Sequence, residues 1–191
     1  MDIKLPQIIG ITGRKFNGKD TIGNHLEKQY GYVVIHYAEP IKQISKILFG
    51  FNEAQLYGDL KEEIDKFWGT SPRAIMQFLG TEIFRNQISQ VIPDIENNFW
   101  VKCLEIKVKQ ILLINPNQKI AICDVRFSNE VDSIKAMGGK IIRVNRKKCT
   151  NIDTHESEKN IDSLIVDCEI NNDSTLQELF ISVDDFLTKN E

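Results

Sequence analysis

The residues that decide the fold are QIIGITGRKFNGKDT at positions 7–21. They begin with an apolar, β-branched run from Gln7 to Thr12, which predicts a buried strand. A short segment with two glycines follows, and the sequence from Thr21 to Tyr30 has a helical pattern. We therefore expect a buried strand, a tight loop and a helix in direct succession.

The loop, Gly13-Arg-Lys-Phe-Asn-Gly18-Lys19, fits the GxxxxGK pattern of a phosphate-binding loop and stands in the required place between a strand and a helix. Glycines let the backbone fold into a nest of N–H groups, and the N-terminus of the helix supplies partial positive charge. Lys19 is the residue that would reach the terminal phosphates. The loop predicts nucleotide binding, and a glycine-rich turn without a ligand is the alternative.

Asp20 departs from the usual pattern, which has Ser or Thr at this position to ligate Mg²⁺. Thr21 comes one residue later, about 100° further round the helix, and so it is not a simple substitute. We expect Asp20 to act on the Mg²⁺ shell, directly or through water. The alternatives are that other groups hold the ion, or that Asp20 is only a favourable charge at the start of the helix.

Hydrophobic patterns in the rest of the chain predict four more strands and five more helices. The strands are expected at Tyr32–His36, Lys119–Cys123, Lys140–Val144 and Leu164–Ile170. The helices are expected at Ala38–Phe51, from Ser71 to about Gln90, and at Phe99–Leu113, Asn129–Met137 and Ser174–Leu187. Residues 52–70 are polar and mixed, which predicts a loop or a short exposed helix. Five short strands that alternate with helices predict an α/β fold with a parallel sheet and helices on both faces.

A second group of polar residues, Asp124-Val-Arg126-Phe-Ser-Asn-Glu130, follows the apolar strand at 119–123. Ligands bind at the carboxyl ends of parallel strands in α/β sheets. One interpretation puts Arg126 on a substrate phosphate and the two carboxylates on the base, the sugar or the orientation of that substrate. The alternative is that Arg126 and Glu130, four residues apart on one helical face, form a surface ion pair with a helix cap.

Composition excludes several classes of protein. The 191 residues contain 24 Lys and Arg against 27 Asp and Glu, and this net charge of −3 argues against a dedicated nucleic-acid binder. No apolar run approaches the ~20 residues that span a membrane, so we expect a cytoplasmic protein, in the host cytoplasm if the source is viral. A zinc site is not expected, because no CxxC or HxxxH pair occurs among Cys103, Cys123, Cys149, Cys168, His25, His36 and His155.

Taken together, these segments resemble the deoxynucleoside monophosphate kinases of the large DNA phage type, within the P-loop kinases. Individually the motifs are weak, but they recur in the same order over most of the chain. They are GKDT at 18–21, AEPIK at 38–42, PRAIMQFLGTEI at 72–83, FWVK at 99–102, DVRFSNE at 124–130, AMGGKIIRVNR at 136–146, DTHESE at 153–158 and NNDSTLQELF at 171–180. Around residues 49–70 this chain is shorter than the phage enzyme.

The resemblance implies one P-loop kinase domain over residues 1–191, with a five-stranded parallel sheet, a helical acceptor-binding region at about 37–100 and a lid at about 146–160. It implies transfer of the γ-phosphoryl group of ATP, with Mg²⁺, to a deoxynucleoside monophosphate, giving the diphosphate and ADP. ATP and this acceptor are the expected partners in deoxynucleotide metabolism. The oligomeric state stays open, with a homodimer among the possibilities.

The same resemblance assigns roles to individual residues. Catalysis falls to Lys19, Asp20 and Arg126, and Asp20 is the candidate metal ligand. ATP binding falls to Gly13, Arg14, Gly18, Lys19, Asp20, Thr21 and Arg146. Acceptor binding falls to Lys42, Arg73, Gln77, Trp100, Asp124, Arg126 and Glu130. From spacing alone, Trp100 is equally a packing residue, and Gln77 and Lys42 are ordinary polar residues of helices.

Two other functions stay open. One is a P-loop kinase for another small acceptor, such as dephospho-coenzyme A or phosphomevalonate; an alcohol acceptor would need a base, which Asp124 or Asp20 could provide. The other is a nucleotide-binding module without turnover. The NKxD motif that recognises guanine is absent, since Asn145-Arg-Lys-Lys148 does not match it.

Overall fold

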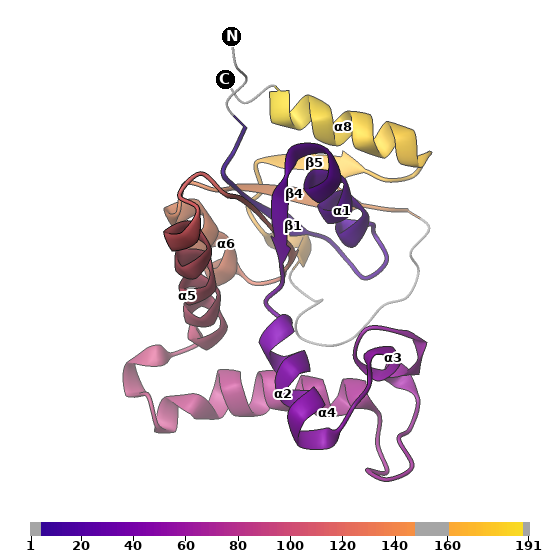
Figure 1. Ribbon diagram of the computed structural model, residues 1–191, viewed down its shortest axis with the longest axis vertical. Coiled ribbons are helices and arrows are strands. Elements are labelled where there is room, and N and C mark those ends of the chain that lie inside the picture. Colours follow the sequence, from indigo (N-terminus) through magenta and orange to yellow (C-terminus); the bar gives the residue numbers. More distant parts are fainter. Residues whose placement is uncertain (1–4, 148–160, 189–191) are drawn as a thin grey trace. The chain divides into compact units, whose positions relative to one another are not determined.

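The centre of the fold is a five-stranded sheet in which every strand runs parallel to its neighbours (Figure 1). The structure is a computed structural model that describes residues 5–147 and 161–188. Its strand order is β2 (Tyr32–Ile35), β3 (Lys119–Val125), β1 (Ile8–Thr12), β4 (Lys140–Asn145) and β5 (Cys168–Asn171). The parallel five-stranded sheet expected from the sequence is confirmed.

Two compact units make up the chain. The sheet belongs to the first unit, Met1–His36 with Leu104–Glu191, and the second unit is Tyr37–Cys103. The helices of the first unit are α1 (Lys19–Tyr30), α5 (Phe99–Ile114, most of which lies in this unit), α6 (Ser128–Ala136), the 3₁₀ turn η5 (Ile161–Ser163) and α8 (Leu176–Thr188). No helix in the described ranges is long and apolar enough to cross a bilayer.

Both faces of the sheet are covered by helices, which explains why the central strand β1 is buried over its whole length. On one face, Ile9 and Ile11 of β1 pack in a cluster with residues of α1 and α8. On the other face, α6 packs so closely that a Cβ at Gly10 would lie 2.9 Å from Cδ1 of Ile134. Figure 1 shows α1 and α8 on one side of the sheet and α5 and α6 on the other.

A β-bulge interrupts β3 near its carboxyl end. Gly10 pairs with Ile122 and Thr12 pairs with Val125, so two residues, Cys123 and Asp124, stand opposite the single residue Ile11. A bulge adds a residue to one strand and redirects the side chains that follow it. Asp124 therefore lies within β3, at the bulge, rather than just beyond the strand as the sequence suggested.

Strand β5 begins four residues later than predicted. Expected at Leu164, it begins at Cys168, where the pairing with Ile142 of β4 starts. Just before that point, Asp167 makes two hydrogen bonds with Ile141. Its backbone N–H donates to Ile141 O at 2.9 Å, and its side-chain Oδ2 accepts from Ile141 N at 2.8 Å. Because a side chain takes the place of a backbone acceptor here, regular pairing cannot extend to Leu164.

The second unit consists of short helices and turns. These are α2 (Glu39–Phe49), α3 (Glu53–Leu56), η1 (Asp59–Glu62), α4 (Pro72–Phe78), η2 (Leu79–Gln87), η3 (Ile88–Gln90) and η4 (Pro93–Ile95). Its buried apolar residues Phe51, Leu56 and Met76 form a small core. Residues 52–70, expected as a loop or one short helix, contain two short helices, and Asn52 begins the first with a capping box to Gln55.

The helix expected from Ser71 to about Gln90 is not a regular α-helix throughout. Ser71 caps α4 as predicted, since its Oγ accepts from Ala74 N at 3.2 Å. From Leu79 to Gln87 the chain forms a π-helix, and the carbonyl of Gly80 accepts the indole N–H of Trp100 at 2.9 Å. A partner from a distant residue thus satisfies a carbonyl within the widened turns, which local sequence patterns do not reveal.

We expect Gly139→Ala to destabilise the first unit. A Cβ at Gly139 would lie 2.7 Å from Cγ2 and 2.9 Å from the carbonyl oxygen of Ile134, so backbone would have to move. Overpacking of this kind costs about 1–3 kcal/mol, which urea unfolding would measure. Gly80→Ala is the matched control, because nothing lies within 4 Å of its added Cβ. Equal stability of the two variants would contradict this packing.

Candidate functional site

The phosphate loop joins β1 to α1 with the geometry that its glycines allow. Gly13 has φ 147° and Gly18 has φ 102°, values that residues with a side chain rarely adopt. Gly18 is also the N-cap of α1 and provides no side-chain hydrogen bond there. A helix start whose N-cap residue offers no side chain to its first N–H groups suits an anion.

Lys19 is buried beneath the loop, with 9 % of its surface exposed. Its Nζ donates to the carbonyl oxygens of Gly13 at 2.7 Å and Arg14 at 2.9 Å. Burial, assisted by the charge of Arg126, lowers the pKa of Lys19 to about 8, against the opposing effect of Asp20 and Asp124. The ammonium is therefore charged at neutral pH and lies within a set of acidic and basic groups.

The structure brings the predicted catalytic residues of the first unit together. Asp20 follows Lys19 at the start of α1, and Asp124 and Arg126 stand at the end of β3, the neighbour of β1. The charges of Asp20 and Asp124 raise the pKa of Lys19, and the charge of Arg126 lowers it. The Asp20 side chain is 81 % exposed, and its Oδ1 lies 3.3 Å from Nε2 of His36. His36 follows β2 at the same carboxyl edge of the sheet. It had no predicted role in the site, although its place at the carboxyl end of a predicted strand was the available signal.

Glu130 caps the start of α6, as the alternative interpretation expected, but it is buried and does not lie at the surface. Its side chain is 2 % exposed, and Oε2 accepts from the backbone N–H of Arg126 at 2.8 Å and of Phe127 at 3.2 Å. Arg126 precedes α6, so the two residues do not share a helical face as the spacing suggested. The carboxylate caps the start of α6 and holds the backbone that carries Arg126, which accounts for it without a substrate.

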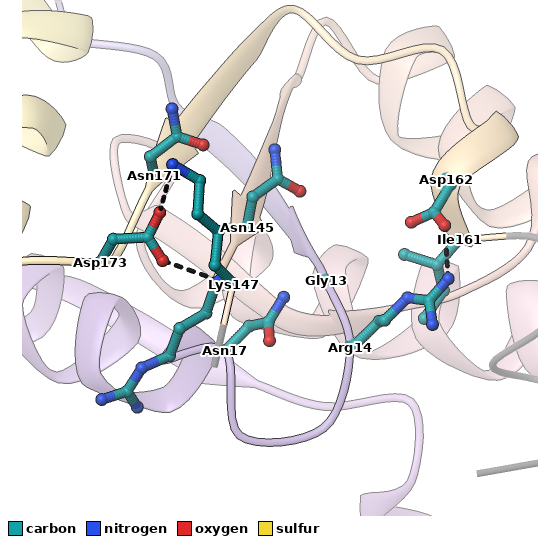
Figure 2. A pocket seen from close by; sticks show the side chains of 10 residues that line it. Gly13, Arg14, Asn17, Asn145, Lys147, Ile161, Asp162, Asn171 and Asp173 are labelled. Atoms are coloured by element: carbon teal, nitrogen blue, oxygen red, sulfur yellow. Dashed lines mark hydrogen bonds and ion pairs between the residues drawn. The ribbon is translucent and has the colours of Figure 1, made fainter. Parts of the chain in front are cut away.

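A pocket of about 190 Å³ opens beside the phosphate loop (Figure 2). Four segments line it: the loop, the end of β4 with the two residues after it, η5, and the end of β5 with Asp173. Gly13, Arg14 and Arg146, predicted to bind ATP, all belong to the lining. Seven further residues line the pocket and had no role predicted from the sequence: Asn17, Asn145, Lys147, Ile161, Asp162, Asn171 and Asp173.

Ion pairs and hydrogen bonds fix the charged groups around this pocket. Arg14 Nη2 pairs with Asp162 Oδ2 at 2.5 Å, which raises the pKa of Arg14. The backbone N–H of Lys147 donates to Asp173 Oδ1 at 2.7 Å, and its Nζ lies 3.6 Å from Oδ2 (Figure 2). Arg146 donates to the carbonyl oxygen of Phe16 in the loop at 3.4 Å. The lining thus contains three cationic side chains and two carboxylates, and the carboxylates pair with two of the cations, Arg14 and Lys147.

Three of the predicted acceptor residues lie on two helices of the second unit. Arg73 and Gln77 are one turn apart on α4, and both are half-buried. Arg73 Nη1 lies 3.5 Å from Glu62 Oε1. Lys42, on α2, places its Nζ 4.1 Å from the ring centre of Tyr57. Each cation is held by a neighbour within its own unit.

Trp100 is a packing residue in this structure. It is 6 % exposed, its Nε1 donates to Gly80 O, and its ring meets Phe84 and Phe99 edge to face at 5.5 and 5.0 Å. A ring with these contacts is part of the interior of the second unit. The packing interpretation therefore accounts for Trp100, and stacking on a base is not needed to explain it.

Some predicted features lie outside the described residues. The lid was expected at about 146–160, of which only Arg146 and Lys147 fall in the described ranges; His155 and Cys149 fall outside them. Among the described residues, no group of three or more His, Cys, Asp and Glu side chains could hold a metal ion.

The fold and the site together define a class of protein. A phosphate loop follows the central strand β1, a buried lysine lies beneath it, and Asp124 and Arg126 come from the neighbouring strand β3 and the residue after it. With the strand order β2-β3-β1-β4-β5, this is the architecture of a P-loop kinase.

Comparisons with known proteins identify the family within this class to which the chain belongs. The deoxynucleotide monophosphate kinase family model matches residues 49–183. A deoxynucleotide monophosphate kinase homologue from Acanthamoeba polyphaga mimivirus is 32 % identical over 180 residues, which cover 92 % of this chain and 93 % of that protein. The chain therefore belongs to the deoxynucleotide monophosphate kinase family.

More distant similarities agree with this result. The deoxynucleotide monophosphate kinase of Enterobacteria phage T4 is 30 % identical over 125 residues, which cover 65 % of this chain and 48 % of that enzyme. The match thus spans about half the length of the phage enzyme. Among solved structures, TT1252 from Thermus thermophilus has a TM-score of 0.50 and 14 % identity, covering 98 % of this chain and 100 % of that one, which is a likeness of fold alone.

We expect Glu130→Ala to reduce stability by about 2 kcal/mol, because two partly buried N–H groups would lose their common acceptor. Urea unfolding would measure the loss. Glu130→Gln keeps one acceptor oxygen and serves as the matched control, with a smaller loss. If Glu130→Ala kept full stability and lost only activity, the carboxylate would be a substrate ligand and not a cap.

Proposed function

We propose that this protein transfers the γ-phosphoryl group of ATP to the 5′-phosphate of a deoxynucleoside monophosphate, giving the diphosphate and ADP. The main support for this proposal is the placement of four charged residues: Lys19 lies buried against the loop carbonyls, Asp20 follows it in α1, and Asp124 and Arg126 stand at the end of the neighbouring strand β3. It combines two cations for a transferred phosphoryl group with two carboxylates on the same edge of the sheet. Membership of the deoxynucleotide monophosphate kinase family supports this choice of reaction.

The chemistry asks little of the protein beyond positioning and charge. The second pKa of a phosphate monoester is about 6, so an acceptor phosphate is already a dianion near neutral pH and needs no general base. An oxygen of that phosphate attacks the γ-phosphorus, and the bond to the bridging β–γ oxygen breaks, leaving ADP. Lys19 and Arg126 lower the barrier by offsetting the negative charge that spreads over the transferred group.

The carboxylates suit a magnesium ion, which prefers oxygen ligands and keeps several of its waters. Asp20 is the better candidate, because its side chain is 81 % exposed at the start of α1, next to Lys19. Asp124, at the bulge of β3, is the second candidate, either directly or through water. When bound with ATP, the ion would neutralise charge on the β- and γ-phosphates.

The pocket beside the loop suits the rest of the donor nucleotide. It adjoins Gly13 and Arg14 of the phosphate loop, and Arg146 reaches from the end of β4 to the loop carbonyl of Phe16. A nucleotide whose phosphates occupy the loop could therefore place its sugar and base in this volume. We assign Arg14 and Arg146 to ATP, together with the loop residues Gly13, Gly18 and Thr21.

In the second unit, we assign Arg73, Gln77 and Lys42 to acceptor binding. In the first unit, we assign Arg126 and Asp124 to acceptor binding. Arg73 can bind a phosphate through the two parallel donors of its planar guanidinium group, and Gln77 can both donate to and accept from the edge of a base.

The cytoplasmic location and the homodimer considered from the sequence stay predictions.

The direct experiment is ADP release from Mg-ATP, measured against a panel of deoxynucleoside and ribonucleoside monophosphates. We expect turnover only when an acceptor is supplied, with at least one deoxynucleotide among the good acceptors. Dephospho-coenzyme A and phosphomevalonate are the controls for another kinase of the same fold. Turnover with either of these and with no nucleotide would contradict the proposal, as would bound ATP that is never consumed.

Arg126→Lys should damage acceptor use more than ATP binding. The variant keeps the charge but loses the bidentate donor group, so we expect kcat/KM for the acceptor to fall ~10–100-fold while the affinity for ATP changes little. Lys19→Met is the matched control, since loss of this cation should reduce kcat with every acceptor. An equal loss for both substrates in Arg126→Lys would move Arg126 to the donor side.

A further inference from the structure

Two buried asparagines tie the phosphate loop to the ends of two neighbouring strands. Asn17, the loop residue before Gly18, is 4 % exposed, and its Nδ2 donates to the carbonyl oxygen of Val144 at 2.7 Å. Asn172, which follows β5, is 8 % exposed, and its Nδ2 donates to the carbonyl oxygen of Asn17 at 2.9 Å. The N–H of Asn172 in turn donates to Asn145 O at 2.7 Å. The loop is therefore bonded to the ends of both β4 and β5.

The loop also lies in close contact with the groups to which it is bonded. A Cβ at Gly13 would lie 2.5 Å from the carbonyl oxygen of Val144, and a Cβ at Gly18 would lie 2.5 Å from Nδ2 of Asn172. The two glycines thus prevent steric clashes, while the two asparagines supply the hydrogen bonds. Together these contacts set the position of the loop above the edge of the sheet.

Asn17 occupies this place at an energetic cost. Its Oδ1 is a buried atom for which the described part of the chain provides no hydrogen-bond partner. A buried acceptor without a partner is rare and calls for an explanation. The unpartnered Oδ1 is explained if the hydrogen bond from Nδ2 of the same side chain to Val144 O is needed to hold the loop in place.

We propose that Asn17 and Asn172 are positioning residues for the phosphate loop, acting on the donor phosphates through Lys19 and the loop N–H groups. The effect of these residues on the reaction rate rests on the proposed function, whereas the test below requires only that the protein binds a nucleotide. Lys19 Nζ donates hydrogen bonds to Gly13 O and Arg14 O, both in the loop. A shift of the loop therefore moves the ammonium with it, and a misplacement of about 1 Å can cost ~10²-fold in rate.

The test compares the affinities for ADP and for adenosine of Asn17→Ala, Asn172→Ala and Asn172→Asp. The last variant keeps the size of the side chain but cannot donate to Asn17 O. Ser133→Ala is the matched control, because Ser133 is 8 % exposed and its Oγ makes one hydrogen bond, to Glu105 in α5, away from the loop. Thermal unfolding of each variant establishes that it is folded before its affinities are compared.

We expect the asparagine variants to bind ADP ~10-fold more weakly or worse while adenosine affinity stays within about twofold of the wild type, because only ADP uses the loop. Ser133→Ala should lower Tm about as much as the asparagine variants do, and it should leave the affinities for ADP and adenosine unchanged. The double variant Asn17→Ala/Asn172→Ala should be about as weak as the weaker single variant, since the two residues act as one unit.

Equal weakening for ADP and adenosine, or ADP affinities within about twofold of the wild type, would overturn the inference. Asn172→Asp keeps the test decisive if either alanine variant fails to fold. The measurement also separates the two claims: a wild type that binds ADP but phosphorylates no deoxynucleotide would end the proposed function and leave the inference on the loop to be decided by these affinities.

Discussion

The burial of the Lys19 ammonium is the constraint on which the rest of the site depends. A cation that is 9 % exposed must be surrounded by polar groups, because removing charge from water is costly. Here the carbonyl oxygens of Gly13 and Arg14 accept its hydrogen bonds, and Asp20 and Asp124 supply opposite charge. The loop must therefore curl around Nζ, which requires the positive φ angles at Gly13 and Gly18.

The sheet provides the surroundings that this constraint needs. Because β1 lies between β3 and β4, the loop that leaves β1 has Asp124 and Arg126 on one side and the end of β4 on the other. The bulge at Cys123 and Asp124 interrupts the strict alternation of β3 close to the lysine. On the β4 side, Val144 O accepts a hydrogen bond from Asn17 Nδ2. The same oxygen lies too close to Gly13 for that residue to carry a side chain. The buried apolar strands are thus a rigid frame for one charged group.

Much of this could be predicted from the sequence, because the signals were local. The strand–loop–helix at residues 7–30, the five strands and the Ser71 cap each follow from neighbouring residues. The burial of Glu130, the bulge at Asp124 and the role of Asn172 could not be predicted, because each depends on how separate segments meet. Trp100 illustrates the same limit: its indole N–H finds Gly80 O, twenty residues away, within a π-helix that no pattern had suggested.

Phosphorus NMR would show whether the charges around the loop serve phosphoryl transfer to a nucleotide. The protein would be incubated with Mg-ATP and a deoxynucleoside monophosphate, and the products identified by their resonances. We expect the α- and β-phosphorus signals of a deoxynucleoside diphosphate to grow in equal amount with those of ADP. Release of inorganic phosphate in place of the diphosphate, or unchanged ATP with every nucleotide, would contradict this expectation.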